Sequence, residues 1–516
     1  MAYEYLPLKP EAIAGAVPAW RATVTPVQLR ETCALAAAHD ARLAALWGSD
    51  ERDRGEGYAL HVTLASAEGL LWLSAALAAE RPEYPDLSDL FYCAPRLQRA
   101  TLDLLGIRPV AAGALSVDTR EWLRHGAWPE TAYPLRRDAA PNYAPVDDRY
   151  AFVPVDGDGV HEIPVGPVHA GTIEPGHFRF SVVGEKVLRL EARLGYTHKG
   201  IEKRFEQMRP IEGARLAARV SGDSTVAYAW AYAMALESIA GVTPPARALL
   251  LRALLLERER VANHLGDLGY LGNDGGLAFG LAQFMRLKED WLRLNARLFG
   301  HRYLMDQVVP GGVARDVDHE GGAALVAQCN TLEAEVKTLR GVYDEHAGLQ
   351  DRFITCGRLT PETAARLGVI GLAGRASRQS WDARVRPGFA PYARLAPRPV
   401  THRNGDVAAR VTVRFEEIFE SLRLMRAIAQ MLEPGAIVAA LPATIAGSGL
   451  GFVEGWRGEV LIALETGADG RIRRCHPHDP SWQNWPAIEH AVIGNIVPDF
   501  PLINKSFNLS YSGPDL

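Results

Sequence analysis

A long helical pattern in the middle of the chain constrains its fold more than any other feature. The segment "PARALLLRALLLERERVANHL" begins at Pro245, a residue suited to the first turn of a helix, and its apolar residues recur at three- and four-residue spacing. About two hundred residues after Gly195 share this kind of pattern. We therefore expect a mainly helical body, in which "LLLERERVANHL" forms a core helix with a solvated charged stripe and His264 is a packed histidine.

Shorter patterns precede this helical body. The segment "FRFSVVGEKVLRLEARLG", at residues 178–195, alternates around a Gly-Glu pair and predicts a β-hairpin. Nearer the N-terminus, "YALHVTLAS" at residues 58–66 predicts a strand, and "LLWLSAALAAE" at residues 70–80 predicts a helix. These patterns indicate a small unit of mixed strands and helices ahead of the helical body.

The composition changes near residue 140, which divides the chain. The segment "PLRRDAAPNYAPVDDRYAFVPVDGDG" is rich in Pro, Asp and Gly, as is typical of a linker. A chain of 516 residues is long enough for two or three domains. We predict an α+β protein with a small N-terminal α/β domain at residues 1–138, a linker at 139–160, and a mainly helical domain with a small β-hairpin region at 161–516.

The composition also excludes several classes of protein. The formal net charge of -5 is small for this length, so we expect no nucleic-acid partner. The N-terminus lacks the pattern of a signal peptide, and no stretch of about 18 uninterrupted apolar residues occurs, so any membrane association must go through a partner. The cysteines form no C-x-x-C pair and are expected to be reduced, buried residues of a cytoplasmic protein: Cys33, Cys93, Cys329, Cys356 and Cys475.

Several long segments follow one another in the order found in a known family. In the helical domain they are "GPVHAGTIEPGHFRF", "YTHKGIEKRFE", "ERVANHLGDLGYLGNDGG", "VPGGVARD", "GLAGRASRQSWDARVRPGFAPY" and "GFVEGWRGEVL". Together they resemble the large subunit of energy-converting nickel-iron hydrogenases, and they are similar to the 49 kDa subunit of respiratory complex I. Several long motifs in the right order are a far more specific signal than a single short pattern.

The N-terminal domain carries a second resemblance. The segments "QRATLDLLGI" and "YPLRRD" resemble the signature region of the 30 kDa subunit of complex I. A fusion of the two subunits in one chain is typical of large subunits of the formate-hydrogenlyase type. The combined resemblance covers nearly the whole chain, and it implies the folds of both subunits.

The resemblance breaks down at the metal ligands. The hydrogenases hold nickel and iron with two C-x-x-C pairs, because soft thiolates bind and bridge these metals. In "RVSGDS" Ser221 and Ser224 stand at the first pair, and in "SFNLSYSGPDL" Ser510 and Gly513 stand at the second. A hydroxyl is a poor ligand for nickel, and glycine offers no side chain. We therefore expect no metal and no cofactor bound by this chain, and no hydrogenase activity.

The resemblance to complex I points to a quinone region. Relatives without the cysteines bind the quinone headgroup through a His and a Tyr; His169 stands at the first position, whereas Gly222 stands at the second. The alternative for His169 is a histidine that satisfies a backbone carbonyl. Asp382 and Arg384 in "WDAR" match a charged pair that lines the family's cavity, and their alternative is a structural ion pair joining two elements.

A proton-transfer role is implied for the start of the hairpin. Glu174 stands where the hydrogenases keep a proton-conducting carboxylate, and His177 lies beside it in the sequence. The alternative for Glu174 is an ordinary loop charge. We expect the hairpin and the later "WDAR" loop to bring these candidates around the first serine pair. The segment "CHPHDP" at residues 475–480 looks like a metal motif but lacks a fourth ligand, so we expect a loop there.

Two interpretations of function remain open, with a third as an outlier. In the first, the chain is a peripheral subunit on the cytoplasmic face of the inner membrane, in a complex I-like or hydrogenase-related oxidoreductase. It docks an iron-sulfur small subunit, which holds the clusters, and couples to antiporter-like and anchor membrane subunits. In the second, the vacated cavity binds quinone or another small acceptor. The chain would then take part in electron transport of the NADH:quinone oxidoreductase type, which involves binding of NAD and quinone. The third is a soluble binding module outside any complex. Such a module would have little need of the N-terminal domain, whose evident use is contact with partner subunits.

Overall fold

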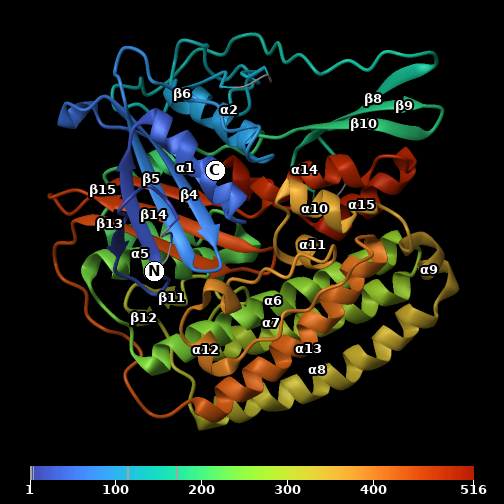
Figure 1. Ribbon diagram of the computed structural model, residues 1–516. Helices are drawn as coiled ribbons and strands as arrows, with labels where there is room; N and C mark the ends of the chain where they lie inside the picture. The colour runs from blue at the N-terminus through green and yellow to red at the C-terminus, as the bar shows by residue number, and fades with distance from the viewer. Residues whose placement is uncertain (1–2, 4, 113–115, 170–172) are drawn as a thin grey trace.

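The computed structural model describes residue 3 and residues 5–112, 116–169 and 173–516 (Figure 1). Helices account for 43% of the chain and strands for 18%, divided between an N-terminal sheet unit and a larger helical body. The expected α+β class is therefore confirmed. None of the helices in these described ranges is long and apolar enough to span a bilayer.

The N-terminal unit is a five-stranded sheet with helices on it. In the order β1-β2-β5-β4-β3, its strands are β1 (Glu11–Ile13), β2 (Ala19–Val24), β5 (Gly69–Leu77), β4 (Tyr58–Ser66) and β3 (Arg42–Asp50). The unit also contains α1 (Pro26–Ala38), α2 (Ala94–Leu105), β6 (Glu83–Pro85) and β7 (Arg108–Val110). Helix α1 begins at Pro26 because Thr25 and Gln28 cap each other's backbone N–H groups.

One predicted element in this unit is wrong. Residues 70–80 were expected to form a helix, but residues 69–77 are strand β5. Strand β5 hydrogen-bonds to β2 on one side and to β4 on the other, so it is a central strand of the sheet. A central strand covered on both faces carries a continuous apolar run rather than an alternating one, and such a run has the same composition as a buried helix.

The segment predicted as a linker is extended and held against the rest of the chain. Residues 139–159 contain no helix or strand, and β8 (Val160–Val165) follows them. Arg193 forms an ion pair of 2.7 Å with Asp148, and the Tyr150 hydroxyl donates to Glu191 at 2.9 Å. These contacts attach the connecting segment to strand β10, so it is not a free tether.

The predicted hairpin is confirmed as part of a three-stranded sheet. Strands β9 (His177–Val183) and β10 (Lys186–Arg193) are antiparallel neighbours, and β8 pairs with the other edge of β9. In Figure 1 this small sheet lies at the upper right, apart from the blue N-terminal sheet.

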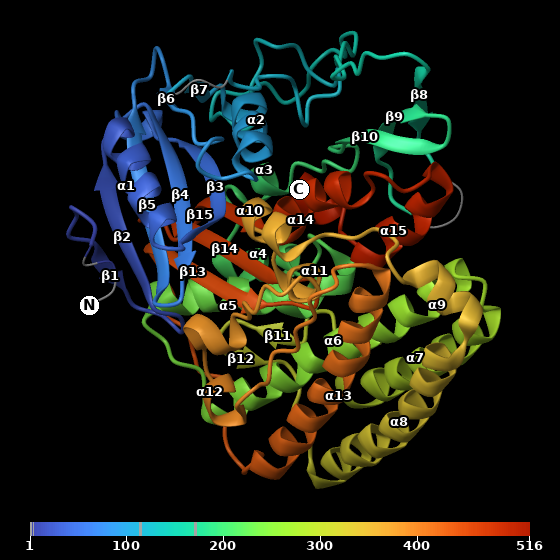
Figure 2. The same ribbon diagram turned by 45° about the vertical axis from the view of Figure 1, so that its right-hand side comes forward.

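The helical body is built around four long helices. Helix α6 (Ala246–Asp274) packs against α7 (Ala278–Phe299) and α13 (Val407–Met431), and α13 packs in turn against α8 (His319–Glu345) (Figure 2). The sequence places Pro245 in the first turn of this helix; in the structure Pro245 is the N-cap, and α6 begins one residue later at Ala246. The shorter helices are α3 (Ile201–Phe205), α4 (Pro210–Ala217), α5 (Thr225–Ala240), α9 (Ala347–Phe353), α10 (Pro361–Leu367), α11 (Gly371–Arg375) and α12 (Tyr392–Leu395).

The charged residues of α6 correct a second prediction. Glu257, Arg258, Glu259 and Arg260 were expected to form a solvated stripe, but all four are buried. The reason is that α6 is covered on opposite sides. Arg258 donates to a backbone carbonyl of α7 at 3.2 Å, whereas Arg260 donates to the carbonyl oxygen of Glu454, at the end of β13, at 2.7 Å. His264 is fully buried, as expected.

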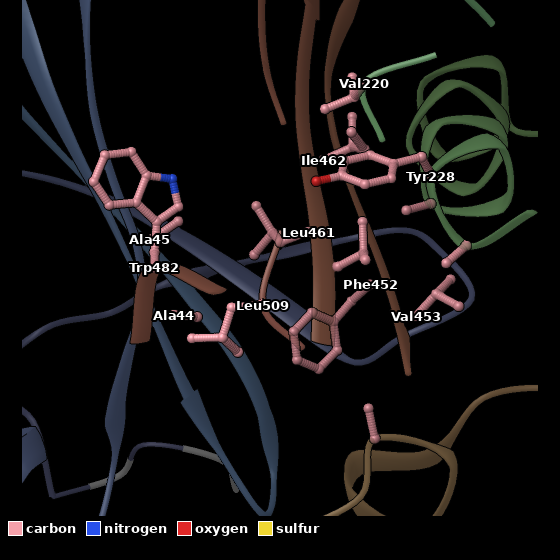
Figure 3. Close-up of a cluster of buried hydrophobic side chains, with 14 of the residues drawn as sticks. Ala44, Ala45, Val220, Tyr228, Phe452, Val453, Leu461, Ile462, Trp482 and Leu509 are labelled. Carbon is pink, nitrogen blue, oxygen red and sulfur yellow. The ribbon is translucent and has the colours of Figure 1, made fainter. Parts of the chain in front are cut away.

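A second sheet and the last helices close the core. The strands are β13 (Gly447–Glu454), β14 (Glu459–Thr466) and β15 (Ile472–His478), and the remaining elements are β11 (Val308–Val309), β12 (Gly312–Val313), α14 (Ser481–Ala491), α15 (Phe500–Phe507) and α16 (Ser512–Asp515). The loop predicted at residues 475–480 is largely strand β15. Figure 3 shows β14 between Ala44 and Ala45 of β3 on one side and Tyr228 of α5 on the other, so both units share one hydrophobic core.

Candidate functional site

The four positions that hold metal in the resembled hydrogenases meet in the interior. Ser221 and Ser224 lie on the short turn that leads into α5, and Ser510 and Gly513 lie between α15 and the end of α16. The hydroxyl oxygens of Ser221 and Ser510 are 3.1 Å apart and share a hydrogen bond. The Gly513 N–H donates to the Ser510 hydroxyl at 2.9 Å. All four residues are buried, so the structure brings the two motif frames into one centre.

An ion pair closes one side of this centre. Arg457 binds the carboxylate of Asp223 through both terminal nitrogens, at 2.6 and 2.8 Å. One of these nitrogens also lies 3.4 Å from the Ser224 hydroxyl, and the Arg457 Nε donates to the Asn508 carbonyl at 2.6 Å. Burial alone would raise the pKa of Asp223, but the guanidinium holds it below its ordinary value, so the pair is charged. Arg457 lies within the motif "GFVEGWRGEVL", but the motif alone did not single it out.

A carboxylate closes the other side. A Cβ atom added to Gly513 would stand 2.2 Å from the Asp479 Oδ2, far inside van der Waals contact. Asp479 is fixed there, because it accepts hydrogen bonds from the Tyr228 hydroxyl at 2.7 Å and from the Ser481 N–H at 2.8 Å. The space that a cysteine side chain needs at position 513 is therefore occupied. Asp479 was also missed by sequence reasoning, although it lies within "CHPHDP".

The residues of this centre do not fit a nickel-iron group. The side chains that converge on it are hydroxyls, carboxylates and a guanidinium, none of which replaces a bridging thiolate. The nearest cysteine in sequence, Cys475, is buried on β15, and burial raises its pKa well above the ordinary value. Within the part of the chain that the structure describes, no group of three His, Cys, Asp or Glu residues is arranged to hold a metal ion.

A buried carboxyl lies behind the first serine pair. Glu259 of α6 accepts the N–H groups of Val226 and Ala227, at 2.7 and 3.2 Å, where α5 begins. Burial raises the pKa of Glu259 to about 8, and the nearby charge of Asp223 adds to this effect. At neutral pH most of the Glu259 population is therefore protonated.

The two candidate histidines bind backbone carbonyls of their own loop. His169 Nε2 lies 2.8 Å from the Gly176 carbonyl oxygen, and His177 Nδ1 lies 3.1 Å from the Gly166 carbonyl oxygen. Burial lowers the pKa of His177, which keeps its ring neutral. This geometry is the one expected for histidines that stabilise the turn before β9. Residues 170–172 of the same motif lie outside the described residues.

Glu174 lies at the surface beside the end of the chain. Its side chain is exposed, and it accepts the Ser512 N–H at 3.3 Å. Ser512 is the residue before Gly513, so Glu174 is next to the vacated centre but on its solvent side. The Glu174 carboxylate is in contact with solvent. The His177 Nδ1, by contrast, is hydrogen-bonded to the Gly166 carbonyl oxygen.

Asp382 and Arg384 hydrogen-bond to each other and to α6. Arg384 binds Asp382 through two nitrogens, at 2.6 and 3.0 Å, and Glu257 of α6 through the third, at 3.0 Å. The Tyr392 hydroxyl donates to the same Glu257 at 2.7 Å. The pair thus joins its own loop to α6, and its hydrogen bonds do not reach the serine positions. The gathering of all cavity candidates around Ser221 stays a prediction, because these hydrogen bonds alone do not test it.

Comparison with known proteins identifies the family. Residues 22–144 match the family described as "Respiratory-chain NADH dehydrogenase, 30 Kd subunit", and residues 274–448 match "Respiratory-chain NADH dehydrogenase, 49 Kd subunit". The chain is 31% identical over 488 residues to formate hydrogenlyase subunit 5 of Escherichia coli (strain K12), an alignment that covers 92% of this chain and 84% of that protein. The chain belongs to this fused large-subunit family. The resemblance stated from the motifs is confirmed.

Two further similar proteins extend the comparison. A fused NADH-quinone oxidoreductase polypeptide of Phocaeicola vulgatus is 28% identical over 451 residues, covering 83% of this chain and 86% of that protein. A chain of the solved membrane-bound sulfane sulfur reductase, an archaeal respiratory membrane complex, has the same fold over 70% of this chain and 100% of its own length, with a TM-score of 0.66 and 24% identity. Homologues of this protein are therefore subunits of membrane-bound hydrogenase or complex I-like complexes.

Proposed function

We propose that this large-subunit homologue is a peripheral subunit of a membrane-bound, energy-converting oxidoreductase complex, in which it works without nickel-iron chemistry. It docks an iron-sulfur small subunit, which carries the clusters, and couples it to antiporter-like and anchor membrane subunits. Its place is the cytoplasmic face of the inner membrane. In this role the chain supplies interfaces and a rigid interior rather than the reacting metal.

The closed centre is the observation that carries this proposal. Ser221 and Ser510 bind each other, Arg457 and Asp223 form an ion pair beside them, and Asp479 fills the position next to Gly513. A redox group in this place needs ligands or open space. The side chains present offer neither soft ligands nor room at position 513.

The competing function is a quinone or another small acceptor held in the former metal position. Such an acceptor would have to displace the Arg457–Asp223 pair, whose two hydrogen bonds are 2.6 and 2.8 Å long. Arg457 is buried but the Asp223 side chain is 38% exposed, so separating the pair has a free-energy cost because it leaves a buried guanidinium without its counterion. This cost favours the docking function over acceptor binding at the four positions.

Affinity purification from native membranes tests the proposal. The tagged chain is expected to sediment with membranes and to copurify with an iron-sulfur protein, whereas elemental analysis of the isolated chain is expected to show no stoichiometric nickel. A tagged chain that runs entirely as a soluble monomer in native extracts would contradict the docking function. About one nickel per chain would contradict the loss of metal chemistry.

A further inference from the structure

A set of buried charges between α6, α13 and the end of β13 is not used by the proposed function. It contains four carboxylates and three guanidiniums, and no side chain in it is more than 3% exposed. We call it the buried charge network, and its members are Glu257, Asp382, Glu417, Glu454, Arg260, Arg375 and Arg384.

Two of the guanidiniums are committed to three of the carboxylates. Arg384 donates to Asp382 through two nitrogens, the shorter contact being 2.6 Å, and forms an ion pair with Glu257 at 3.0 Å. Arg260 lies 3.3 Å from Glu257 and 3.8 Å from Glu417. Asp382, Glu257 and Glu417 thus each lie beside at least one of these two cations.

Glu454 has no guanidinium of its own. Its Oε1 accepts from Arg375 at 2.7 Å, but the same guanidinium contacts Glu417 at 2.8 Å and lies 3.9 Å from Asp382. Among the described residues, the Oε2 of Glu454 accepts only the Ala383 N–H, at 3.0 Å. One positive charge is therefore shared among three carboxylates, and Glu454 is the one that depends on it alone.

Three guanidiniums cannot neutralise four carboxylates, and a buried carboxylate without compensation takes up a proton instead. We propose that the buried charge network binds one exchangeable proton, and that Glu454 is the carboxyl group that carries it. The proton comes from water and returns to it, and no electron moves in this step. Burial, and then the negative charge of Asp382, raise the pKa of Glu454 to about 7, in agreement with this assignment.

The histidine beside the network does not take the proton. His264 Nε2 lies 2.8 Å from Glu417, which favours a charged ring. Burial and the positive charges of Arg414 and Arg260 oppose it, and together they lower the pKa of His264 below its ordinary value. The imidazole is thus neutral and donates one hydrogen bond to Glu417.

The strands and helix that pack on Glu454 add no free cation. Glu459 stands opposite Glu454 in the register of β13 and β14, and Arg42 is its own partner at 2.5 Å. On α5, which packs against β13, Glu237 is paired with Arg252 at 2.5 Å. When these two paired neighbours are counted as well, the carboxylates still outnumber the guanidiniums by one.

Infrared spectroscopy of the purified full-length chain tests the proposal without any partner subunit. Spectra recorded across neutral pH are expected to show the carbonyl stretch of a buried protonated carboxyl, which disappears as the pH rises. Because Glu259 is a second buried carboxyl that is protonated at neutral pH, the comparisons are made in a Glu259→Gln background, in which Glu454→Gln is expected to remove the component of the signal that titrates near pH 7. Glu417→Gln keeps Glu454 but leaves three carboxylates for three guanidiniums, so the titration of Glu454 is expected to move downward by about one to two pH units.

The control is Glu185→Gln at the exposed turn of the hairpin, which is expected to leave the signal unchanged. Circular dichroism establishes that each variant is folded. If the component near pH 7 persists in Glu454→Gln, or if Glu417→Gln leaves its midpoint unmoved, the assignment is wrong. Because these measurements use the isolated chain, their failure would leave the docking function untouched, and failure of docking would leave the proton site untouched.

Discussion

Replacing Gly513 by alanine tests the claim that the space beside Gly513 is filled by Asp479. The backbone of Gly513 does not lie in the left-handed region, so the substitution brings no backbone strain of its own. The added Cβ would stand 2.2 Å from the Asp479 Oδ2 and 2.5 Å from its Cγ. Asp479, which is 1% exposed, must therefore move against its two hydrogen bonds.

The expected cost follows from these contacts. Forcing extra volume into a packed interior costs about 1–3 kcal/mol. Loss of one hydrogen bond to a buried carboxylate adds about 1.5–3 kcal/mol. We expect Gly513→Ala to lower the free energy of unfolding by about 2.5–6 kcal/mol. Gly222→Ala is the matched control, since its added Cβ would meet no atom within 4 Å.

A double-mutant cycle with Asp479→Ala isolates the clash. Unfolding of the full chain in guanidinium chloride, followed by circular dichroism, supplies the four free energies. In the Asp479→Ala background the cost of Gly513→Ala is expected to fall by about 2 kcal/mol or more, because the obstructing carboxylate is gone and only the Ser510 hydroxyl oxygen, at 2.9 Å from the added Cβ, remains close. An equal cost of Gly513→Ala in both backgrounds would refute the assignment of Asp479 as the group that fills this position.

Three further predictions concern the same region. Glu174→Gln is expected to impair ion or proton coupling in the assembled complex while leaving assembly intact, with Glu185→Gln as control; unchanged coupling would reduce the role of this chain to that of a scaffold. The double change Ser221→Cys and Ser224→Cys is expected to restore neither nickel binding nor hydrogen-dependent dye reduction, because the second pair is still absent. The folded pKa of Glu259, about 8, exceeds its ordinary value of 4.5, so the wild-type chain loses stability as the pH rises between these values. The stability of Glu259→Gln relative to wild type is expected to rise by roughly 4 kcal/mol over that range, and a pH-independent difference in unfolding free energy would contradict this.

The sequence predicted which residues meet in the serine centre but not which residues close it. The motif frames placed Ser221 and Ser510 correctly in one centre, because each frame fixes the local course of the backbone. Arg457 reaches Asp223 across 234 residues of sequence, and no local pattern reports such a contact. Asp479 was not predicted as part of the site, because the Cys and His residues before it in the sequence resemble a metal motif.

Local patterns failed where burial overrides them. Strand β5 reads as a helix because its two neighbouring strands and the covering layers make every position apolar. The charges of α6 read as a solvated face, yet Arg258 and Arg260 donate to α7 and to the end of β13 on opposite sides. In both elements the deciding neighbours come from distant parts of the chain, which a window of residues does not contain.

The fused chain also fixes the proportions of its two units. Arg42 of the N-terminal sheet is the counterion of Glu459 in the second unit, and Arg473 of β15 pairs with Glu51 at 2.6 Å. If the units were made as separate polypeptides, an excess of the second would leave Glu459 without its cation until a partner arrived. Covalent linkage supplies one N-terminal unit to every helical body during synthesis, so the cell needs no balanced expression of two genes to complete this interface.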